Sequence, residues 1–204
     1  MIRVSRVLHS TTAEGPGSRT AVWVQGCTIR CAGCVNPQLF SFDGGTLLEP
    51  ADIVSGAIAA GDEGLTLLGG EPFDQAAEVG ILAEEARRAG LGVITFTGYQ
   101  YERLREAAGG IASLLSSTDL LVDGPFMSES PEPTRALVGS ANQQFVHLTD
   151  RYRDYEPSHA TNRVDIRVGP DGEIEVAGFL TTDRVDELAS MAVARRRFAV
   201  RARG

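Results

Sequence analysis

Cysteine is scarce in this sequence of 204 residues: there are three, and no fourth that could complete a four-thiolate metal site. So few thiols exclude a disulfide framework, and a reducing compartment such as the cytoplasm fits this composition. Positive charge is also in deficit, because Asp and Glu outnumber Lys and Arg by 27 to 19 and the formal net charge is -8. This balance argues against a general nucleic-acid binder and against a protein that binds membrane surfaces.

The sequence also lacks long apolar runs, internal repeats and low-complexity segments. No run is long enough to cross a bilayer, which needs about 20 apolar residues. Residues 1–8 have neither the apolar core nor the small-residue cleavage site of a secretory signal peptide. The length suits one domain with a sizeable core. We therefore expect a single cytoplasmic domain over residues 1–204, with no membrane segment and no nucleic-acid partner.

All three cysteines lie in one short stretch, Cys27, Cys31 and Cys34, with the spacing C-x3-C-x2-C. Thiolates packed this closely on one loop predict a single metal centre. A closed zinc site takes four ligands, and a [4Fe–4S] cluster usually takes one thiolate on each iron. Three thiolates would leave one iron open, and an open position is typical of a metal site that binds a ligand and performs chemistry.

Two simpler interpretations of the cysteines are open at this point. The first is a zinc knuckle with a histidine as the fourth ligand, and the second is three buried cysteines that bind nothing. The three histidines, His9, His147 and His159, are scattered, and none lies at ligand spacing from the cysteine stretch. This distribution disfavours the zinc interpretation, although a spacing motif on its own carries a false-positive risk.

A second motif, Gly69-Gly70-Glu71-Pro72, follows the apolar run at 65–68. Two glycines let the chain bend and let its carbonyl groups approach a ligand closely. Pro72 removes an N–H that would point at a cation, and Glu71 adds negative charge. The segment is therefore suited to a cationic group, although an isolated match could be an ordinary turn between a strand and a helix.

The middle of the chain alternates between predicted strands and predicted helices. The strands are expected at 20–25, 65–68, 91–97 and 119–123, and the helices at 50–60, 75–89, 99–108 and 111–116. Asp74 is expected to cap the helix at 75–89. This alternation indicates βα units with a parallel sheet, and ligands bind at the carboxyl ends of such strands. Because there are too few units for a closed eight-stranded barrel, we expect an α/β fold with an open partial barrel of parallel strands.

Further elements are expected on both sides of this region. They are an edge strand at 2–9, a loop at 10–19, a strand at 144–148, a β-hairpin of 163–168 and 173–176, and a helix at 183–193. Apolar residues alternate on both arms of the hairpin, so we expect its apolar face to pack on the body. We take 20–148 as the core of the domain and 163–194 as an extension. The basic tail, 195–204, is interpreted as a solvated terminus, with docking to an acidic partner as the alternative.

The cysteine spacing resembles the signature of the radical S-adenosylmethionine (SAM) enzymes. In that family the open iron binds the amino and carboxylate groups of SAM, and the reduced cluster splits SAM into methionine and a 5′-deoxyadenosyl radical. The Gly69-Gly70-Glu71-Pro72 segment, 35 residues after Cys34, resembles the family segment whose backbone receives the SAM ammonium group. The resemblance implies a [4Fe–4S] cluster on the three cysteines, SAM as a second cofactor, a flavodoxin or ferredoxin-type electron donor, and the partial-barrel fold of the family.

Within that family the sequence is similar to the small activases of anaerobic ribonucleotide reductases. Its C-A-G-C-V-N loop resembles their C-P-G-C-Y-N, from which Ala32 and Val35 depart. Three shorter segments also resemble segments of these activases: Thr97-Gly98-Tyr99, Val122-Asp123-Gly124-Pro125-Phe126 and Gly139-Ser140-Ala141-Asn142-Gln143. The resemblance covers about residues 20–146. It implies that Thr97, Gly98 and Tyr99 border the SAM ribose and adenine, and that Asp123 and Asn142 border the SAM pocket; from the residues alone, Thr97-Gly98 could cap a strand and Asp123-Gly124 could make a turn.

Three functions are compatible with these features. The first is an activase that abstracts hydrogen from a glycine of a partner glycyl-radical enzyme such as an anaerobic ribonucleotide reductase. It needs no acid–base pair, so no catalytic His or Glu is assigned. The second is a stand-alone radical SAM enzyme that modifies a peptide or a small molecule. The third is an Fe–S module for structure or electron transfer without SAM chemistry, but an electron carrier should close all four irons with cysteine. The extra residues 163–204 leave the target of the first two open.

Overall fold

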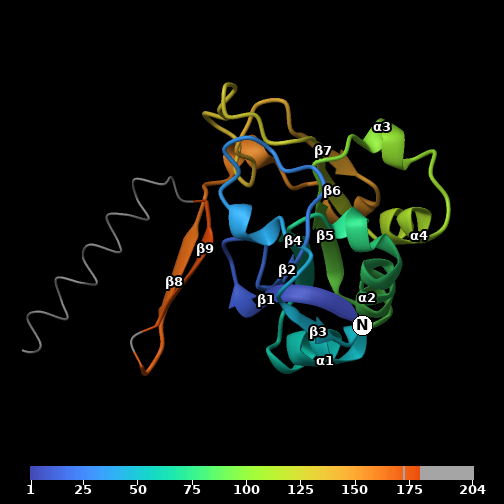
Figure 1. The fold of residues 1–204 in the computed structure, drawn as a ribbon, viewed down its shortest axis with the longest axis vertical. Helices are drawn as coiled ribbons and strands as arrows, with labels where there is room; N and C mark the ends of the chain where they lie inside the picture. The colour runs from blue at the N-terminus through green and yellow to red at the C-terminus, as the bar shows by residue number, and fades with distance from the viewer. Residues whose placement is uncertain (172, 180–204) are drawn as a thin grey trace, which may run out of the picture.

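A seven-stranded sheet in the order β3-β1-β2-β4-β5-β6-β7 forms the centre of the protein in the computed structural model, which describes residues 1–171 and 173–179 (Figure 1). The strands are β1 Ile2–Thr11, β2 Arg19–Val24, β3 Thr46–Leu48, β4 Gly64–Gly69, β5 Gly92–Phe96, β6 Leu120–Asp123 and β7 Gln144–His147. Strands β2, β4, β5 and β6 are parallel, whereas β1 and β7 run antiparallel to their neighbours. The predicted α/β class and the mostly parallel sheet are confirmed. The sheet is open, with β3 and β7 at its two ends, and its closure into a partial barrel stays a prediction.

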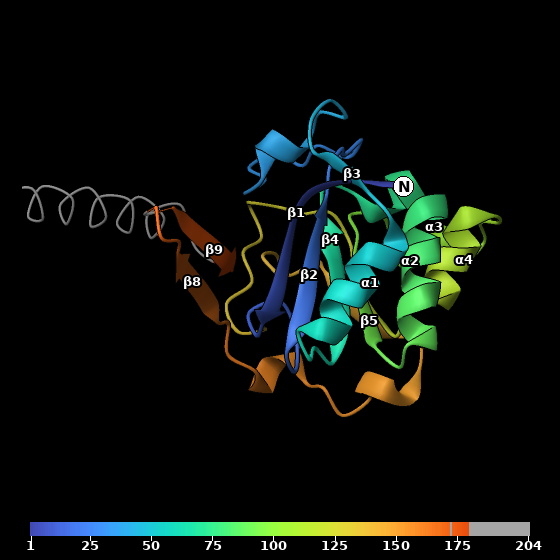
Figure 2. The same ribbon diagram turned by 90° about the horizontal axis from the view of Figure 1, so that it is seen from below.

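Helices cover one face of this sheet (Figure 2). They are α1 Pro50–Ala59, α2 Ala76–Arg88, α3 Tyr101–Leu104 and α4 Gly110–Ser116, with short 3-10 turns at Pro37–Leu39, Pro72–Gln75, Asp150–Tyr152 and Pro157–His159. On α2, the apolar residues at helical spacing all turn towards the sheet and are fully buried; they are Val79, Leu82, Ala83 and Ala86. None of the helices in the described part of the chain has the length and apolar character needed to cross a bilayer.

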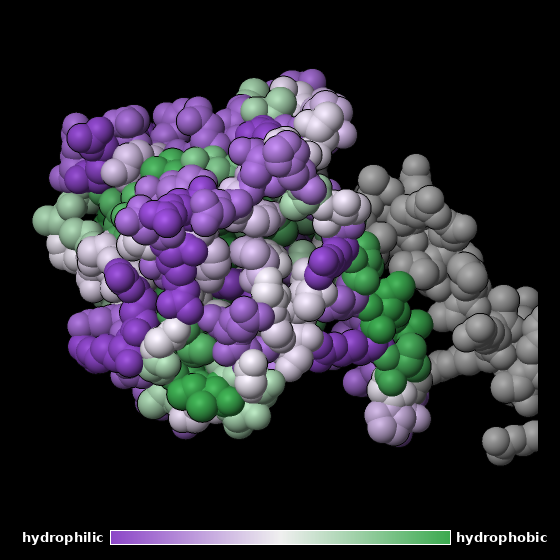
Figure 3. Space-filling model, turned by 180° about the vertical axis from the view of Figure 1, so that it is seen from behind, coloured by the Kyte–Doolittle hydropathy of each residue, from purple (hydrophilic) through white to green (hydrophobic). Residues whose placement is uncertain are grey.

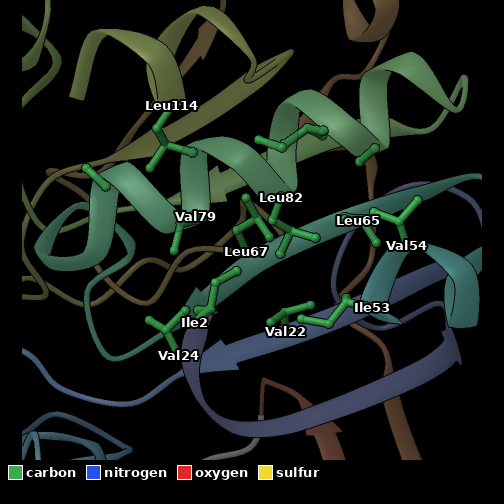
Figure 4. Packing of buried hydrophobic residues seen from close by; sticks show 14 of the residues in the cluster. Ile2, Val22, Val24, Ile53, Val54, Leu65, Leu67, Val79, Leu82 and Leu114 are labelled. Atoms are coloured by element: carbon green, nitrogen blue, oxygen red, sulfur yellow. The ribbon is translucent and has the colours of Figure 1, made fainter. Parts of the chain in front are cut away.

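The main core lies between the helices and the sheet (Figure 4). Side chains alternate along each strand, so Val22 and Val24 of β2 pack towards the helices while Trp23 packs on the opposite face. In the same way Leu65 and Leu67 of β4 enter the helix-side core. This burial on both faces explains why the parallel strands are nearly continuous apolar runs in the sequence.

Most predicted elements are confirmed, and three expectations at their margins are wrong. The first strand is not an edge strand, because β3, which was not predicted, pairs with its outer side. The helix expected at 99–108 contains only Tyr101–Leu104. Asp74 does not cap α2: the N-cap is Gln75, with no side-chain cap bond, because the chain first makes a 3-10 turn over Pro72–Gln75.

A buried arginine closes the end of the sheet where the parallel strands begin. Arg19 is fully buried, and its guanidinium donates to Leu65 O at 2.5 Å, to Gly92 O at 3.1 Å and to the Thr66 hydroxyl at 2.7 Å. It also donates to the Tyr152 hydroxyl at 2.7 Å. Burial lowers the pKa of Arg19. One side chain therefore joins the first residues of β2, β4 and β5. These hydrogen bonds offset the free-energy cost of burying its positive charge.

The predicted hairpin is present as β8 Val164–Val168 and β9 Ile174–Gly178, but its orientation is the reverse of the expected one. The apolar side chains face outward, with exposed fractions of 36% for Val164, 47% for Ile166, 69% for Val168 and 42% for Ile174. Figure 3 shows these hydrophobic residues gathered on the hairpin, at the right of the view. The expectation that the apolar face packs on the body is therefore wrong.

The polar face of the hairpin packs on β1, because β1 offers backbone groups without sheet partners there. The register of β1 shifts between Leu8 and Thr11, and such a bulge leaves amide and carbonyl groups unpaired. Arg167 donates to His9 O at 2.6 Å and to Ser10 O at 3.0 Å, and Asp165 accepts from the Thr11 hydroxyl at 2.5 Å. Charged side chains thus complete the hydrogen bonds of an irregular strand. The expected helix at 183–193 and the basic tail 195–204 lie outside the described residues.

Candidate metal centre

The carboxyl ends of the four parallel strands meet at one edge of the sheet, and each is followed by a predicted motif. The cysteine stretch follows β2, the Gly69-Gly70-Glu71-Pro72 segment ends β4, Thr97-Gly98-Tyr99 follows β5, and Asp123-Gly124 ends β6. The strands end in register, because Val24 pairs with Gly69 and Phe96 pairs with Val122. Motifs far apart in the sequence are therefore neighbours in space, as the parallel fold predicts.

A cavity of about 480 Å³ opens at this edge. Its wall contains all three cysteines and five of the nine other predicted site residues, which are Gly69, Gly70, Glu71, Thr97 and Gly98. The remaining four predicted residues, Pro72, Tyr99, Asp123 and Asn142, are not part of the wall. Asp123 accepts the backbone N–H of Tyr101 at 2.6 Å. The Asn142 amide donates to Pro125 O at 2.7 Å, while its buried Oδ1 has no hydrogen-bond partner among the described residues.

The three thiols are free and differ in depth. Cys27 is buried, whereas Cys31 and Cys34 are partly exposed to the cavity. Burial raises the pKa of the Cys27 thiol, and the backbone N–H groups of Arg30 and Ile29 oppose this rise. Burial also raises the pKa of Cys34, against a hydrogen bond from the backbone N–H of its neighbour two residues on, at 3.4 Å. The loop thus aims N–H donors at sulfur, an arrangement that stabilises thiolates bound to a metal.

Backbone contacts hold this loop against the end of β4. Glu71 N donates to Gly26 O at 2.8 Å, and Cys27 N donates to Phe40 O at 3.3 Å. A Cβ atom on Gly70 would lie 2.1 Å from Gly26 O, so no other residue fits at position 70 without moving the loop. The sequence suggested that these glycines serve the approach of a ligand; the structure shows that Gly70 serves the approach of the cysteine loop itself.

Glu71 ties the ends of β4 and β5 together from inside. Its side chain is almost completely buried and accepts from Phe73 N at 3.0 Å, from the Thr97 hydroxyl at 2.8 Å and from Gly98 N at 2.9 Å. Burial raises the pKa of Glu71 to about 7, although these three donors lower it. The carboxyl group therefore fixes two predicted segments in place while bordering the cavity.

Sequence reasoning missed several residues of the cavity wall, among them Glu14, Asn36, Phe126, Gln143, Asn162 and Phe179. Glu14 is the least expected, since it lies in a loop of turn-forming residues and is nevertheless buried. Its carboxylate accepts Gly178 N at 2.7 Å, and burial raises its pKa. The only signal in the sequence was an acidic residue next to Gly15-Pro16-Gly17, which does not by itself indicate a site.

The donor set fits an iron–sulfur cluster. Three cysteines line one cavity, and each thiolate of a cluster binds a separate iron, so they can stand apart around a common body. Within residues 1–171 and 173–179, no three His, Cys, Asp or Glu side chains are grouped closely enough to hold a single metal ion. Cys27, Cys31 and Cys34 are therefore the residues that could hold the cluster, and the rest of the cavity wall leaves room for a ligand on its open side.

Comparison with known proteins gives consistent results. A family model described as a 4Fe-4S single cluster domain matches residues 13–146. The anaerobic ribonucleoside-triphosphate reductase-activating protein of Haemophilus influenzae is 31% identical over 141 residues, which are 64% of this chain and 88% of that protein. The proteins of the same name from Vibrio cholerae and from Enterobacteria phage T4 are 31% and 29% identical, over 67% and 71% of this chain and 92% and 94% of their own length.

Proposed function

The chain belongs to the 4Fe-4S single cluster domain family, and from this premise we propose that it is a radical SAM oxidoreductase that activates a glycyl-radical enzyme. Its partner would be an enzyme of the anaerobic ribonucleotide reductase class, since the relatives bear the name of activating proteins for that reductase. The proposal includes a [4Fe–4S] cluster and SAM as cofactors, a flavodoxin or ferredoxin-type electron donor, a cytoplasmic location and the partial-barrel fold of radical SAM enzymes.

One observation carries the proposal: the three cysteines and the glycine-rich end of β4 line the same cavity. A cluster with three thiolates keeps one iron free, and a ligand that chelates this iron must also reach the neighbouring backbone. The carbonyl groups of Gly69 and Gly70 are the backbone acceptors at that place, since Gly70 N already donates to Val24 O at 2.9 Å. A structural or electron-transfer cluster has no use for such a second binding surface.

Each group of residues in the cavity wall has its own role in the proposal. Cys27, Cys31 and Cys34 would hold the cluster, while Gly69 and Gly70 would receive the methionyl part of SAM. Glu71 keeps Thr97 and Gly98 at the cavity wall through the hydrogen bonds described above. Phe96, Phe126 and Val138 contribute apolar surface to the wall, which would disfavour water beside a bound ligand.

The chemistry that a bound cluster would supply is one electron, taken from the donor protein, for the cleavage of a C–S bond of SAM. The products would be methionine and a 5′-deoxyadenosyl radical, which would become 5′-deoxyadenosine by taking a hydrogen atom from the Cα of the partner's glycine. The protein's own contribution is positioning and exclusion of water. No general acid or base takes part in this balance, because the transferred hydrogen carries its own electron. The opening of the cavity on the surface would admit a loop of the partner protein.

The test is anaerobic. The purified full chain is reconstituted with iron and sulfide, reduced, and mixed with SAM, and 5′-deoxyadenosine is quantified with and without a candidate anaerobic reductase. We expect deoxyadenosine together with a glycyl-radical EPR signal on the reductase. A well-loaded cluster that yields no deoxyadenosine would overturn the radical SAM proposal and favour a structural cluster. Deoxyadenosine without a radical on any reductase would overturn the partner assignment and move the activity to a peptide or small molecule.

A further inference from the structure

Asp74 accepts three hydrogen bonds from residues that are distant in the sequence. Its Oδ2 accepts Thr28 N at 2.6 Å, and its Oδ1 accepts the Thr28 hydroxyl at 2.9 Å and the Tyr99 hydroxyl at 3.0 Å. The two hydroxyl groups also lie 3.0 Å from each other. Asp74, Thr28 and Tyr99 thus form a closed polar triangle, here named the Asp74 triad.

Each corner of the Asp74 triad stands on a different part of the candidate metal centre. Thr28 directly follows Cys27 in the cysteine loop. Tyr99 follows Thr97 and Gly98 of the cavity wall, and its backbone N–H donates to the Thr97 hydroxyl at 3.1 Å. Asp74 lies in the turn that follows the glycine-rich end of β4. One carboxylate therefore links the three loops that β2, β4 and β5 deliver to the cavity.

The folding of its own element does not account for this arrangement. Asp74 begins no helix, because α2 has Gln75 as its N-cap and no side-chain cap bond. It is only partly buried, so water could solvate its carboxylate without any of these contacts. A carboxylate that instead takes a backbone N–H and two hydroxyl groups gives strong, directional bonds, because hydrogen bonds to an ionised acceptor are the stronger kind.

We propose that Asp74 is a positioning residue, which holds the loop of Cys27 and the ring of Tyr99 in one fixed relation so that the site binds cluster and SAM together. The inference rests on the proposed function and deepens it. Asp74 touches neither cofactor in this scheme and acts through Thr28 and Tyr99. Removing the carboxylate frees both Thr28 and Tyr99, whereas removing the Tyr99 hydroxyl frees the ring alone, so either change breaks the link between the Cys27 loop and the Tyr99 ring.

A double-mutant cycle on the cluster-loaded chain tests this statement. The variants are Asp74→Asn, Tyr99→Phe and the two combined, and the quantity measured is the dissociation constant of SAM in anaerobic equilibrium dialysis. We expect each single change to weaken SAM binding about fivefold, because each breaks the one hydrogen bond from Tyr99 to Asp74 that joins the ring to the Cys27 loop. The combined variant should be less than about twofold weaker than either single variant, because coupled residues are non-additive.

A matched control is Glu78→Gln, which removes the same charge from an exposed position in the first turn of α2. We expect SAM binding within about twofold of the original protein, because the charge of an exposed side chain is screened by water and salt. Tyr99→Phe keeps the ring and its packing, so it separates the hydrogen bond from the fold if Asp74→Asn proves unstable. Independent, multiplying effects of the two substitutions would overturn the inference, as would an unchanged affinity in both single variants.

A second readout does not depend on SAM. Hydrogen exchange of the backbone N–H of Thr28, which donates to Asp74, should become at least tenfold faster in Asp74→Asn and stay unchanged in Glu78→Gln. If the original protein binds no SAM while Thr28 exchange responds as expected, the proposed function fails and the positioning role of Asp74 stands. If SAM binds and Thr28 exchange does not respond, the positioning role fails and the proposed function stands.

Discussion

The central sheet and the C-terminal hairpin differ in what they bury: the sheet buries its apolar side chains, whereas the hairpin packs its polar face on the body and leaves its apolar face exposed. In the sheet, the apolar side chains of β2 and β4 pack under α1 and α2, as the hydrophobic effect requires. In the hairpin, the charged side chains of β8 face the body and the apolar ones face outward. The difference teaches that an amphipathic pattern identifies a strand, whereas the surface opposite decides which face is buried. The end of β1 presents unpaired backbone groups. Charged side chains can form hydrogen bonds with them and apolar ones cannot, so the charged face of the hairpin packs there.

The largest effect should come from the apolar side of this comparison. Leu82 of α2 is fully buried between the helix and the sheet. We expect Leu82→Ala to lower the free energy of unfolding by about 2–5 kcal/mol, because it removes buried methyl groups and leaves a cavity. Urea titration followed by circular dichroism measures this change, with the exposed Ile81→Ala on the same helix as control. A loss below about 1 kcal/mol would contradict the assignment of this face as the main core.

A buried carboxyl group gives the second effect, through pH. The folded-state pKa of Glu71 is raised to about 7 from its ordinary value of 4.5, chiefly by burial. The folded protein therefore binds a proton that the unfolded chain has released, and the stabilisation from this group is complete below about pH 4.5 and lost as pH rises through about 7. Its size is on the order of 1–3 kcal/mol. Comparing urea unfolding at several pH values should show a flatter profile for Glu71→Gln than for the original protein, and identical profiles would refute the shift.

The polar side of the hairpin should give a smaller and local effect. Asp165 accepts from the Thr11 hydroxyl at 2.5 Å and from Thr12 N at 3.2 Å. We expect Asp165→Ala to make the amides of β8 and β9 exchange about tenfold faster, because hydrogen bonds to a charged acceptor contribute about 1.5–3 kcal/mol and these are partly solvated. The melting temperature of the sheet should stay nearly constant. Asp171→Ala, at the exposed turn of the hairpin, is the matched control and should change neither quantity.

The smallest effect should come from the outer face of the hairpin. Ile166 is 47% exposed, although an isoleucine at this place in the sequence reads as a core residue. We expect Ile166→Ser to change the free energy of unfolding by no more than about 0.5 kcal/mol, as for other exposed positions. Thermal unfolding of this variant, run beside Leu82→Ala, compares the two faces directly. A loss comparable to that of Leu82→Ala would show that the outer face is buried in the folded protein.

What the sequence predicted well is what local chemistry determines. The cysteine spacing, the Gly69-Gly70 turn and the apolar runs of β2, β4, β5 and β6 are all written in neighbouring residues. Parallel strands then bring their carboxyl ends together by topology, so the meeting of the motifs at one edge also followed. Strand β3 was missed because it has only three residues and leaves two of them exposed.

What the sequence did not predict depends on partners far along the chain. Asp74 has the residue type and the position that favour a helix cap. Its carboxylate instead accepts hydrogen bonds from Thr28 and Tyr99, which lie 46 and 25 residues away in the sequence. The role of Gly70 follows from its distance to Gly26 O, which no motif records. The orientation of the hairpin depends on a bulge in β1, more than 150 residues earlier. Such pairings become visible only once the chain is folded.

Arg19 stabilises one end of the sheet, whereas the candidate site lies at the other end. This separation has a consequence for protein engineering. Its guanidinium holds β2, β4 and β5 together where they begin, at the end opposite the cavity. The loops that carry the cysteines, Glu71 and Tyr99 leave from the other end. Apolar wall residues at that end, such as Val35 and Phe126, can therefore be exchanged to alter what the cavity accepts, while Arg19 keeps the strands aligned at the far end.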